Sequence, residues 1–153
     1  MIPQGIIIRL ATEADLQAVF GLMDAFGYPN LSPARFGGIY REVLRDPSMF
    51  VVLAEADGVV IGLATVSKRP QLRLTANLVT IDELAIAPDW RGREIGKALL
   101  NHAKGIARHS GCSRLELLTN RSRESYRRGF YIKNGFTEAD SAVMRIDYGF
   151  DDQ

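Results

Sequence analysis

The feature of the sequence that most restricts the fold is the stretch from residue 77 to residue 111. It begins with an apolar run, NLVTIDELAIA, that predicts a strand ended by Pro88. The segment REIGKALLNHAKGIARHSG follows, with apolar side chains on one helical face and Gly111 at its end. A short basic loop with Gly92 and Gly96 connects the two. A strand, a glycine loop and a long helix in this order are typical of a phosphate-binding connection.

The rest of the chain predicts a mixed α/β fold. Strands are expected at residues 6–10, on both sides of an Asp57-Gly58 turn within 49–67, at 77–87, at 113–119, and once or twice within 136–150. Helices are expected at residues 11–27, 32–46, 93–111 and 122–135. The predicted architecture is a mixed, mostly antiparallel twisted sheet of six to seven strands with about four helices on its faces. Without repeats or internal linkers, residues 1–153 are expected to form a single domain.

Composition and charge exclude several classes of function. The net charge of +1 provides no field for nucleic acid or an anionic membrane, so any anion must be captured locally. With one cysteine, Cys112, and two histidines, we expect no disulfide and no metal site. The first residues have no long apolar run, so neither a signal peptide nor a membrane span is predicted. We therefore expect a cytoplasmic protein in a reducing compartment.

The glycine loop does not fit the two best-known nucleotide-binding patterns. In GREIGKA, three residues separate the glycines, where a nucleotide-triphosphate loop has four, and Lys97 is followed by Ala98 where that loop has a hydroxyl for Mg²⁺. The dinucleotide pattern fails because a third glycine is missing at the required spacing. An ordinary basic connection between a strand and a helix remains the alternative.

The segment APDWRGREIGKALL resembles the acetyl-CoA pyrophosphate loop of the GNAT superfamily of N-acetyltransferases, whose pattern is [Arg/Gln]-x-x-Gly-x-[Gly/Ala]. Arg91 matches the first position and Gly96 the last, whereas Glu94 replaces the middle glycine. The segments IIIRLATEADL, VLAEADGVVIGLATV and SRESYRRGFYIKNGF resemble the family's opening strand and helix, its second and third strands, and its last helix. The resemblance implies the acyl-CoA N-acyltransferase fold and indicates no subfamily.

The resemblance also implies which residues bind acetyl-CoA. The coenzyme's pantetheine arm would lie along Leu84, Ala85 and Ile86 through main-chain hydrogen bonds. The pyrophosphate would lie at the loop, formed by Arg91, Gly92, Arg93, Glu94, Ile95, Gly96 and Lys97. Asn120 follows the next strand and is a further coenzyme contact by resemblance, although an asparagine there is also typical of a turn.

The resemblance assigns the acid, and the strand before the loop offers two candidate bases. Tyr131 matches the family tyrosine that contacts the coenzyme and protonates the departing sulfur; Tyr126 would lie about 140° away on one helix. Asp82 or Glu83 would take the amine proton through water. Because adjacent strand residues point to opposite faces, at most one should face the cleft unless a bulge turns the strand. Glu83 is preferred for its reach. A surface ion pair, or a water chain without a dedicated base, remains open.

The predicted function is acetyl-CoA-dependent transfer of an acetyl group to a primary amine of a small molecule or peptide, by direct attack on the thioester. The alternative is a catalytically silent acyl-CoA-binding sensor or partner module, which Glu94 favours. Lys68, Arg69 and Arg73 would favour an acidic acceptor if they face the cleft, and otherwise form a solvated loop. No nucleic-acid or membrane partner is expected, and the resemblance allows a homodimer. His102 is expected at the core or its edge.

Overall fold

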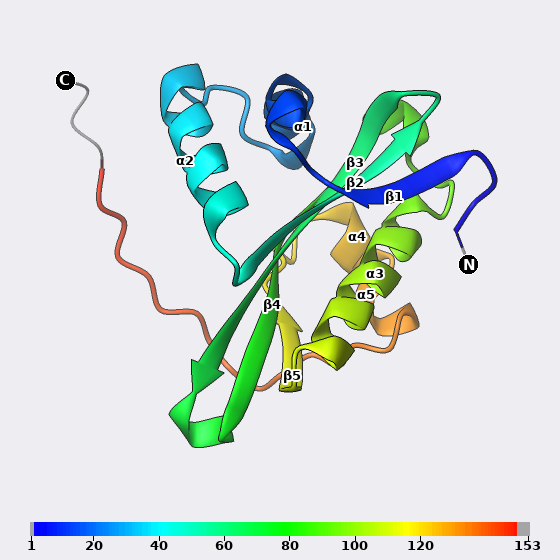
Figure 1. Cartoon of the computed structure of the whole chain (residues 1–153). Helices are drawn as coiled ribbons and strands as arrows, with labels where there is room; N and C mark the ends of the chain where they lie inside the picture. Colours follow the sequence, from blue (N-terminus) through cyan, green and yellow to red (C-terminus); the bar gives the residue numbers. More distant parts are fainter. Residues whose placement is uncertain (1, 150–153) are drawn as a thin grey trace. The chain divides into compact units, whose positions relative to one another are not determined.

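A computed structural model of the chain describes residues 2–149. The chain divides into two compact units, Met1–Leu118 and Thr119–Gln153. The first unit holds a five-stranded sheet and three α-helices, and the second holds two short helices (Figure 1). The predicted mixed α/β class is therefore confirmed. No helix within residues 2–149 has the length and apolar character needed to cross a membrane.

The sheet of the first unit is built mostly from antiparallel neighbours. Its strands lie in the order β1 (Ile6–Leu10), β2 (Met49–Ala56), β3 (Val59–Gln71), β4 (Ala76–Ile86) and β5 (Cys112–Leu117). Strands β1 to β4 pair antiparallel, and β5 pairs parallel to β4. A parallel pair needs a crossover connection, and the long helix predicted after the glycine loop supplies it.

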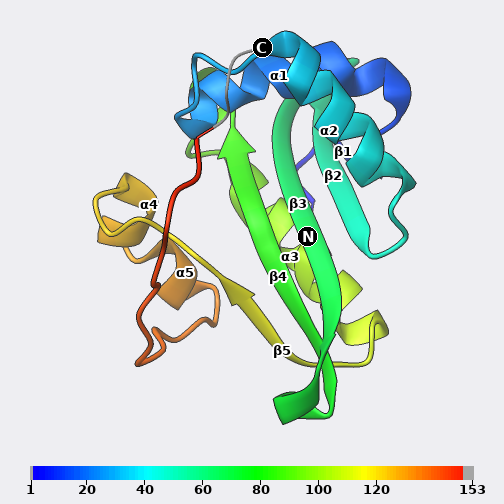
Figure 2. The ribbon, with the colours of Figure 1, turned by 90° about the vertical axis from the view of Figure 1, so that its left-hand side faces the viewer.

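Helices cover both faces of this sheet. Helices α1 (Leu16–Phe26), preceded by the 3-10 turn η1 (Glu13–Asp15), and α2 (Pro33–Arg45) lie over one face, and α3 (Ile95–His109) lies over the other (Figures 1 and 2). The core accordingly has two apolar layers. One joins α1 and α2 to the sheet through Val19, Leu22, Met23, Tyr40, Val51, Leu53 and Leu63. The other joins α3 to the sheet through Ile95, Leu99, Val52, Ala54, Ala56, Ile61 and Ala64.

Local signals place several elements where the sequence predicts them. The Ser32 hydroxyl accepts a hydrogen bond from the Arg35 N–H at 3.3 Å, and Pro33 occupies the first position of α2. Asp57 and Gly58 have φ angles of 49° and 79°, as a two-residue hairpin turn requires. The predicted helix start and hairpin are therefore confirmed.

Strand β3 and helix α3 approach each other closely at Gly62. A Cβ atom at Gly62 would lie 3.1 Å from the Cδ1 atoms of Ile86 and Leu99, and 3.4 Å from Cγ2 of Ile95. Any side chain here would have to displace these neighbours. Because Ile86 ends β4 and Ile95 begins α3, this contact sets the distance between the two ends of the glycine loop.

The last predicted helix is interrupted. Residues 122–135 contain two short helices, α4 (Glu124–Arg127) and α5 (Phe130–Lys133), separated at Gly129 with a φ of 71°. A left-handed residue ends the first helix because it cannot continue right-handed hydrogen bonding. The predicted angle of 140° between Tyr126 and Tyr131, which assumed one continuous helix, therefore does not apply.

The predicted total of six to seven strands is wrong, because residues 136–149 form no strand and the described chain has five. Met144, Ile146 and Tyr148 alternate with polar residues as in a strand, yet they are 90%, 76% and 84% exposed. An alternating segment becomes a strand only beside another strand, and the second unit has none in its described part. Phe150, the end of the predicted range, lies outside the described residues.

Candidate active site

The connection between β4 and α3 contains a 3-10 turn and two residues with left-handed backbone. After Ile86, a 3-10 turn (η3, Pro88–Trp90) leads away from the sheet, and α3 begins at Ile95. Gly92 and Glu94 both have left-handed backbone, with φ angles of 76° and 66°. Apart from Gly92 and its two chain neighbours, no atom of the described chain lies within 4 Å of the Cβ position of Gly92, so the loop backbone is open to close approach there.

Two arginines of the loop make contacts that stabilise the loop itself. The Nε atom of Arg91 donates to the Ile86 carbonyl, and Nη2 donates to the Ala25 carbonyl in the last turn of α1, both at 3.2 Å. The guanidinium carbon of Arg93 lies 4.8 Å from the ring centroid of Trp90. Arg91 thus fastens the loop to β4 and α1, and its predicted contact with phosphate stays a prediction.

The start of α3 provides main-chain donors for an anion. The first intrahelical hydrogen bond runs from the Ala98 N–H to the Glu94 carbonyl at 3.1 Å. The N–H groups of Ile95, Gly96 and Lys97 therefore precede the helical bonding pattern. Unpaired N–H groups at a helix start, together with the helix dipole, attract negative charge, and the Lys97 side chain is exposed beside them.

Glu94 is exposed and lies directly before α3. Within residues 2–149, three residues other than glycine have a positive φ: Asp57, Thr75 and Glu94. The φ and ψ of Glu94, 66° and 11°, explain why the resembling pattern has glycine here, since left-handed backbone favours a residue without Cβ. Glu94 therefore differs from the glycine of the pattern in its side chain, while its backbone has the left-handed conformation that glycine favours.

Strand β4 is paired on both sides for only half its length. Its residues Asn77 to Ile81 pair with β5, whereas its pairing with β3 continues to Ile86. Figure 2 shows β5 diverging from β4. From Asp82 to Ile86, the main-chain groups directed toward β5 have no strand partner in the first unit, and such an edge can hydrogen-bond an extended molecule. The predicted coenzyme edge, residues 84–86, lies within this stretch.

A bulge separates the two candidate bases. Thr65 of β3 pairs with Glu83, and the next residue, Val66, pairs with Ile81, so Asp82 is the extra residue of β4. Asp82 is exposed, and its Oδ1 accepts a hydrogen bond from a neighbouring threonine hydroxyl on β4 at 3.1 Å. Glu83 is half-buried. Glu83 is therefore the more enclosed of the two carboxylates.

Glu83 is held by Thr65 across the hairpin. The Thr65 hydroxyl accepts a hydrogen bond from the Glu83 N–H at 3.0 Å and donates one to Glu83 Oε2. Burial raises the pKa of Glu83 above its ordinary value, the Thr65 hydrogen bond partly offsets this, and the charge of Asp82 adds to it. A carboxyl of raised pKa is a better proton acceptor near neutral pH. Thr65 is absent from the predicted site, because its only sequence signal is one hydroxyl in the apolar run GLATVS.

Within the second unit, Tyr131 is half-buried in α5. Burial raises the pKa of its phenol, while a hydrogen bond with Ser125 and the positive charge of Arg123 act in the opposite direction. The ring lies edge-on to Phe130 and Phe136, with centroids 5.1 and 6.2 Å away. A phenol with a raised pKa keeps its proton at neutral pH and can donate it to a stronger base.

The other polar residues considered in this unit bond one another. The Tyr126 hydroxyl donates to Glu138 Oε2 at 2.9 Å, and Arg121 Nη2 donates to Glu138 Oε1 at 2.6 Å. The Asn120 Oδ1 accepts from the N–H and the hydroxyl of Ser122, at 2.8 and 2.7 Å. Asn120 thus forms the turn that the sequence left open, and its coenzyme contact stays a prediction.

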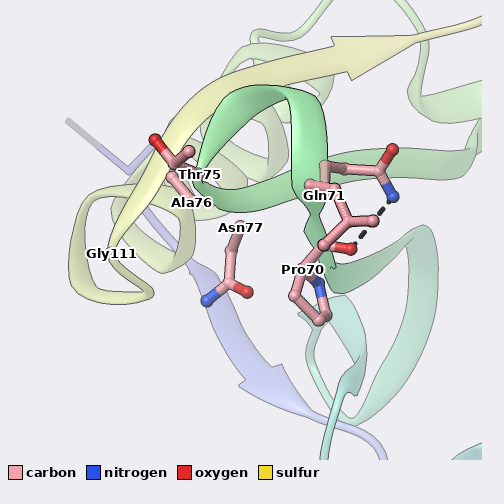
Figure 3. Close-up of a pocket in the computed structure, with 7 residues that line it drawn as sticks. Pro70, Gln71, Thr75, Ala76, Asn77 and Gly111 are labelled. Atoms are coloured by element: carbon pink, nitrogen blue, oxygen red, sulfur yellow. Dashed lines mark hydrogen bonds between the residues drawn. The ribbon is translucent and has the colours of Figure 1, made fainter.

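A hollow of about 480 Å³ lies at the end of β4 that is remote from the glycine loop. Figure 3 shows Pro70, Gln71, Asn77 and Gly111 among the residues around it. The 11 residues of β4 separate it from the loop by about 35 Å. Arg73, in the turn η2 (Leu72–Leu74), lies at this remote end, whereas Lys68 and Arg69 lie within β3; a contact of this basic segment with an acidic acceptor stays a prediction.

The two histidines and the cysteine do not form a metal-binding group within the described residues. The buried stripe of α3 is turned toward Leu100 and Ala107, which leaves His102 exposed, contrary to the prediction. The His109 Nδ1 lies 2.8 Å from the Gly105 carbonyl oxygen, and the Cys112 thiol is half-buried. Residues 2–149 contain no group of three or more His, Cys, Asp or Glu residues that could hold a metal ion.

Comparison with known proteins identifies the family. Residues 15–136 match the model of the Acetyltransferase (GNAT) family. An aminoalkylphosphonate N-acetyltransferase of Salmonella typhimurium is 30% identical over 132 residues, which are 86% of this chain and 85% of that protein. A structure described as a transcriptional regulator from Bacillus halodurans has a TM-score of 0.83 at 26% identity, covering 94% of this chain and 99% of its own. An aminoglycoside N-acetyltransferase in complex with CoA shares the fold, with a TM-score of 0.81 at 21% identity and coverage of 96% and 99%. The chain therefore belongs to the GNAT acetyltransferase family and is an N-acetyltransferase.

Proposed function

We propose that the enzyme takes its acetyl group from acetyl-CoA and transfers it to a primary amine of a small molecule or peptide. The observation that carries the proposal is the continuity of the open β4 edge with the start of α3. An extended, amide-bearing arm that ends in a diphosphate matches this order of main-chain edge followed by anion site. Acetyl-CoA has both parts and supplies the activated acetyl group.

In this proposal, the main-chain groups of Leu84, Ala85 and Ile86 bind the arm of the coenzyme. The loop from Arg91 to Lys97 binds the pyrophosphate, mainly through its N–H groups. An N–H of the same open edge is available to the carbonyl oxygen, where negative charge develops during attack. Asn120 remains a proposed contact with lesser support, because its side chain is occupied by a turn.

Two side chains move protons. Glu83 accepts the proton that the amine loses, directly or through water, as the nitrogen bonds to the carbonyl carbon. The carbon–sulfur bond then breaks, and Tyr131 donates its proton to the departing thiolate. Asp82 is the lesser candidate for the base, since it is exposed and lies at the bulge.

The alternative is a catalytically silent module that binds acyl-CoA. Within this chain, the observation that supports it is Glu94, a carboxylate beside the anion site. The similar structure described as a transcriptional regulator is compatible with such a role. The raised pKa of Glu83 and the enclosed phenol of Tyr131 favour the enzyme, because a silent module has no need of a proton acceptor and donor.

The deciding experiment measures release of free coenzyme from acetyl-CoA with a panel of amines: aminoalkylphosphonates, aminoglycosides, amino acids and peptides. We expect turnover with at least one class, and a loss of kcat of about 100-fold or more in Tyr131→Phe. Tyr126→Phe is the matched control, because its hydroxyl bonds Glu138, and it should retain activity. Wild-type turnover that survives in Tyr131→Phe would show that the acid is another group. Acetyl-CoA binding without turnover on any amine would favour the silent module.

We further propose that residues 1–153 act as one acetyltransferase domain, since the family match includes parts of both units. A homodimer is proposed from the family resemblance alone and is measurable by light scattering. A single unpaired thiol, Cys112, fits a reducing compartment such as the cytoplasm.

A further inference from the structure

The Thr65 hydroxyl makes two hydrogen bonds with Glu83, one with its backbone N–H and one with its carboxylate. Thr65 is only 9% exposed and has one hydroxyl proton. Because its oxygen already accepts the Glu83 N–H at 3.0 Å, that proton is left for the second contact, to Glu83 Oε2. Oε2 is therefore an acceptor in this pair, whereas Oε1 makes no bond to Thr65 and keeps both of its acceptor sites for a proton.

The two contacts also restrain the side chain of Glu83 at a point where the strand is irregular. The pairing of β3 with β4 shifts by one residue between Thr65 and Val66, and Asp82 is the residue left over. A bulge bends a strand and changes the direction of its side chains. By bonding both the backbone and the carboxylate of Glu83, Thr65 fixes the direction that this side chain takes from the bulge.

We propose that Thr65 is a positioning residue for acetyl transfer, which holds Glu83 so that Oε1 faces the proton that the amine loses. The inference deepens the proposed function and depends on Glu83 being the base. Thr65 touches neither substrate; it acts through Glu83. A hydroxyl that donates to a carboxylate stabilises the charged form, so Thr65 also keeps Glu83 ionised at a lower pH than burial alone would allow.

The ionisable groups around this pair do not change the sign of the expected effect, which follows from the loss of the Thr65 hydrogen bond. On β4, Asp82 raises the pKa of Glu83. The helices over this face of the sheet carry further ionisable groups: Asp24 on α1, and Arg35, Tyr40, Arg41, Glu42 and Arg45 on α2. None of these groups changes when Thr65 is replaced. Loss of the hydroxyl therefore raises the pKa of Glu83, and activity that needs ionised Glu83 then appears at higher pH.

The test compares Thr65→Val, which keeps the shape and removes the hydroxyl, with Thr65→Ser, which keeps the hydroxyl. Both are assayed with one amine, so that ionisation of the amine is common to all profiles. In Thr65→Val we expect the acidic limb of kcat/KM to move up by about one pH unit, and kcat to fall about tenfold, with the KM for acetyl-CoA unchanged. Thr65→Ser should stay within about twofold of wild type in kcat, with its acidic limb in place.

A second readout does not depend on turnover. Carboxyl ¹³C NMR of glutamate-labelled protein follows the titration of Glu83, whose signal is identified by its absence in Glu83→Gln. An upward shift in Thr65→Val that accompanies the shift of the acidic limb supports the proposal. An unchanged titration, or a shifted titration with an unchanged acidic limb, overturns it, the second because Glu83 is then not the base. If wild type turns over no amine, the proposed function itself fails, which the NMR titration distinguishes from failure of the Thr65 contact.

Discussion

Replacement of Glu94 by glycine should stabilise the protein. At a φ of 66°, a residue with a Cβ costs about 1–2 kcal/mol relative to ordinary backbone. Glycine avoids this cost but has greater freedom in the unfolded chain, which takes back roughly 0.5–1 kcal/mol. The net gain is about 0.5–1 kcal/mol, which in a chain of this length corresponds to a rise in Tm of about 1–4 °C.

The same substitution should tighten the binding of acetyl-CoA. The Glu94 side chain is exposed, so its repulsion of a phosphate is weakened by water. For unit charges roughly 6 Å apart at the dielectric constant of water, Coulomb's law gives about 0.7 kcal/mol, or about a threefold change in Kd. Because an exposed charge is screened, the change should shrink as salt is added.

Glu94→Gln separates the two effects, because it removes the charge and keeps the left-handed backbone. Thermal unfolding and calorimetric titration with acetyl-CoA should be measured for both variants at low and high salt. We expect both variants to bind about threefold more tightly, and only Glu94→Gly to unfold at a higher temperature. Equal Tm values for the two variants would refute the backbone argument. An unchanged Kd in both would show that the carboxylate is directed away from the phosphate.

Two other substitutions test contacts that stabilise the first unit. Arg9 lowers the pKa of Asp15 from 3.8 to about 2, so this pair stabilises the fold above about pH 4 and the contribution is lost as pH falls toward 2. In urea unfolding, Asp15→Asn should lose about 1–2 kcal/mol at pH 7 and show a flatter decline below pH 4; parallel acid declines would contradict this. Gly62→Ala should cost about 1–3 kcal/mol because its Cβ meets Ile86 and Leu99 at 3.1 Å. Gly21→Ala on α1, whose Cβ would meet nothing within 4 Å, is the control and should be neutral or stabilising.

The sequence predicts elements well where the signal is local. The Ser32-Pro33 start of α2, the Asp57-Gly58 turn and the long helix α3 depend on residues within one or two turns of each other, and the structure has all three. These signals act through hydrogen bonds and backbone angles that form before distant parts of the chain meet.

The sequence does not predict which glycines interrupt a helix. Helix α2 continues through Gly37 and Gly38, whereas the last predicted helix is interrupted at Gly129. Gly37 is buried, with Leu16 of α1 3.8 Å from its Cβ position, so packing against α1 compensates for its weak helix propensity. Gly129 instead lies between two helices of four residues each and adopts a φ of 71°. Propensity alone does not separate the two cases.

The candidate site depends on pairing between strands that are distant in sequence. The sequence supplies the loop, the two carboxylates and the rule that only one should turn inward. Which one is enclosed follows from a single extra residue in the register between β3 and β4, and a register shift of this kind leaves no mark in the composition of either strand. The same register places the Thr65 hydroxyl opposite Glu83. The open edge likewise arises because β5 stops pairing at Ile81 while β3 continues to Ile86. The sequence therefore shows which residues could take part in the reaction. The pairing of the strands determines which of them is enclosed and where its side chain points.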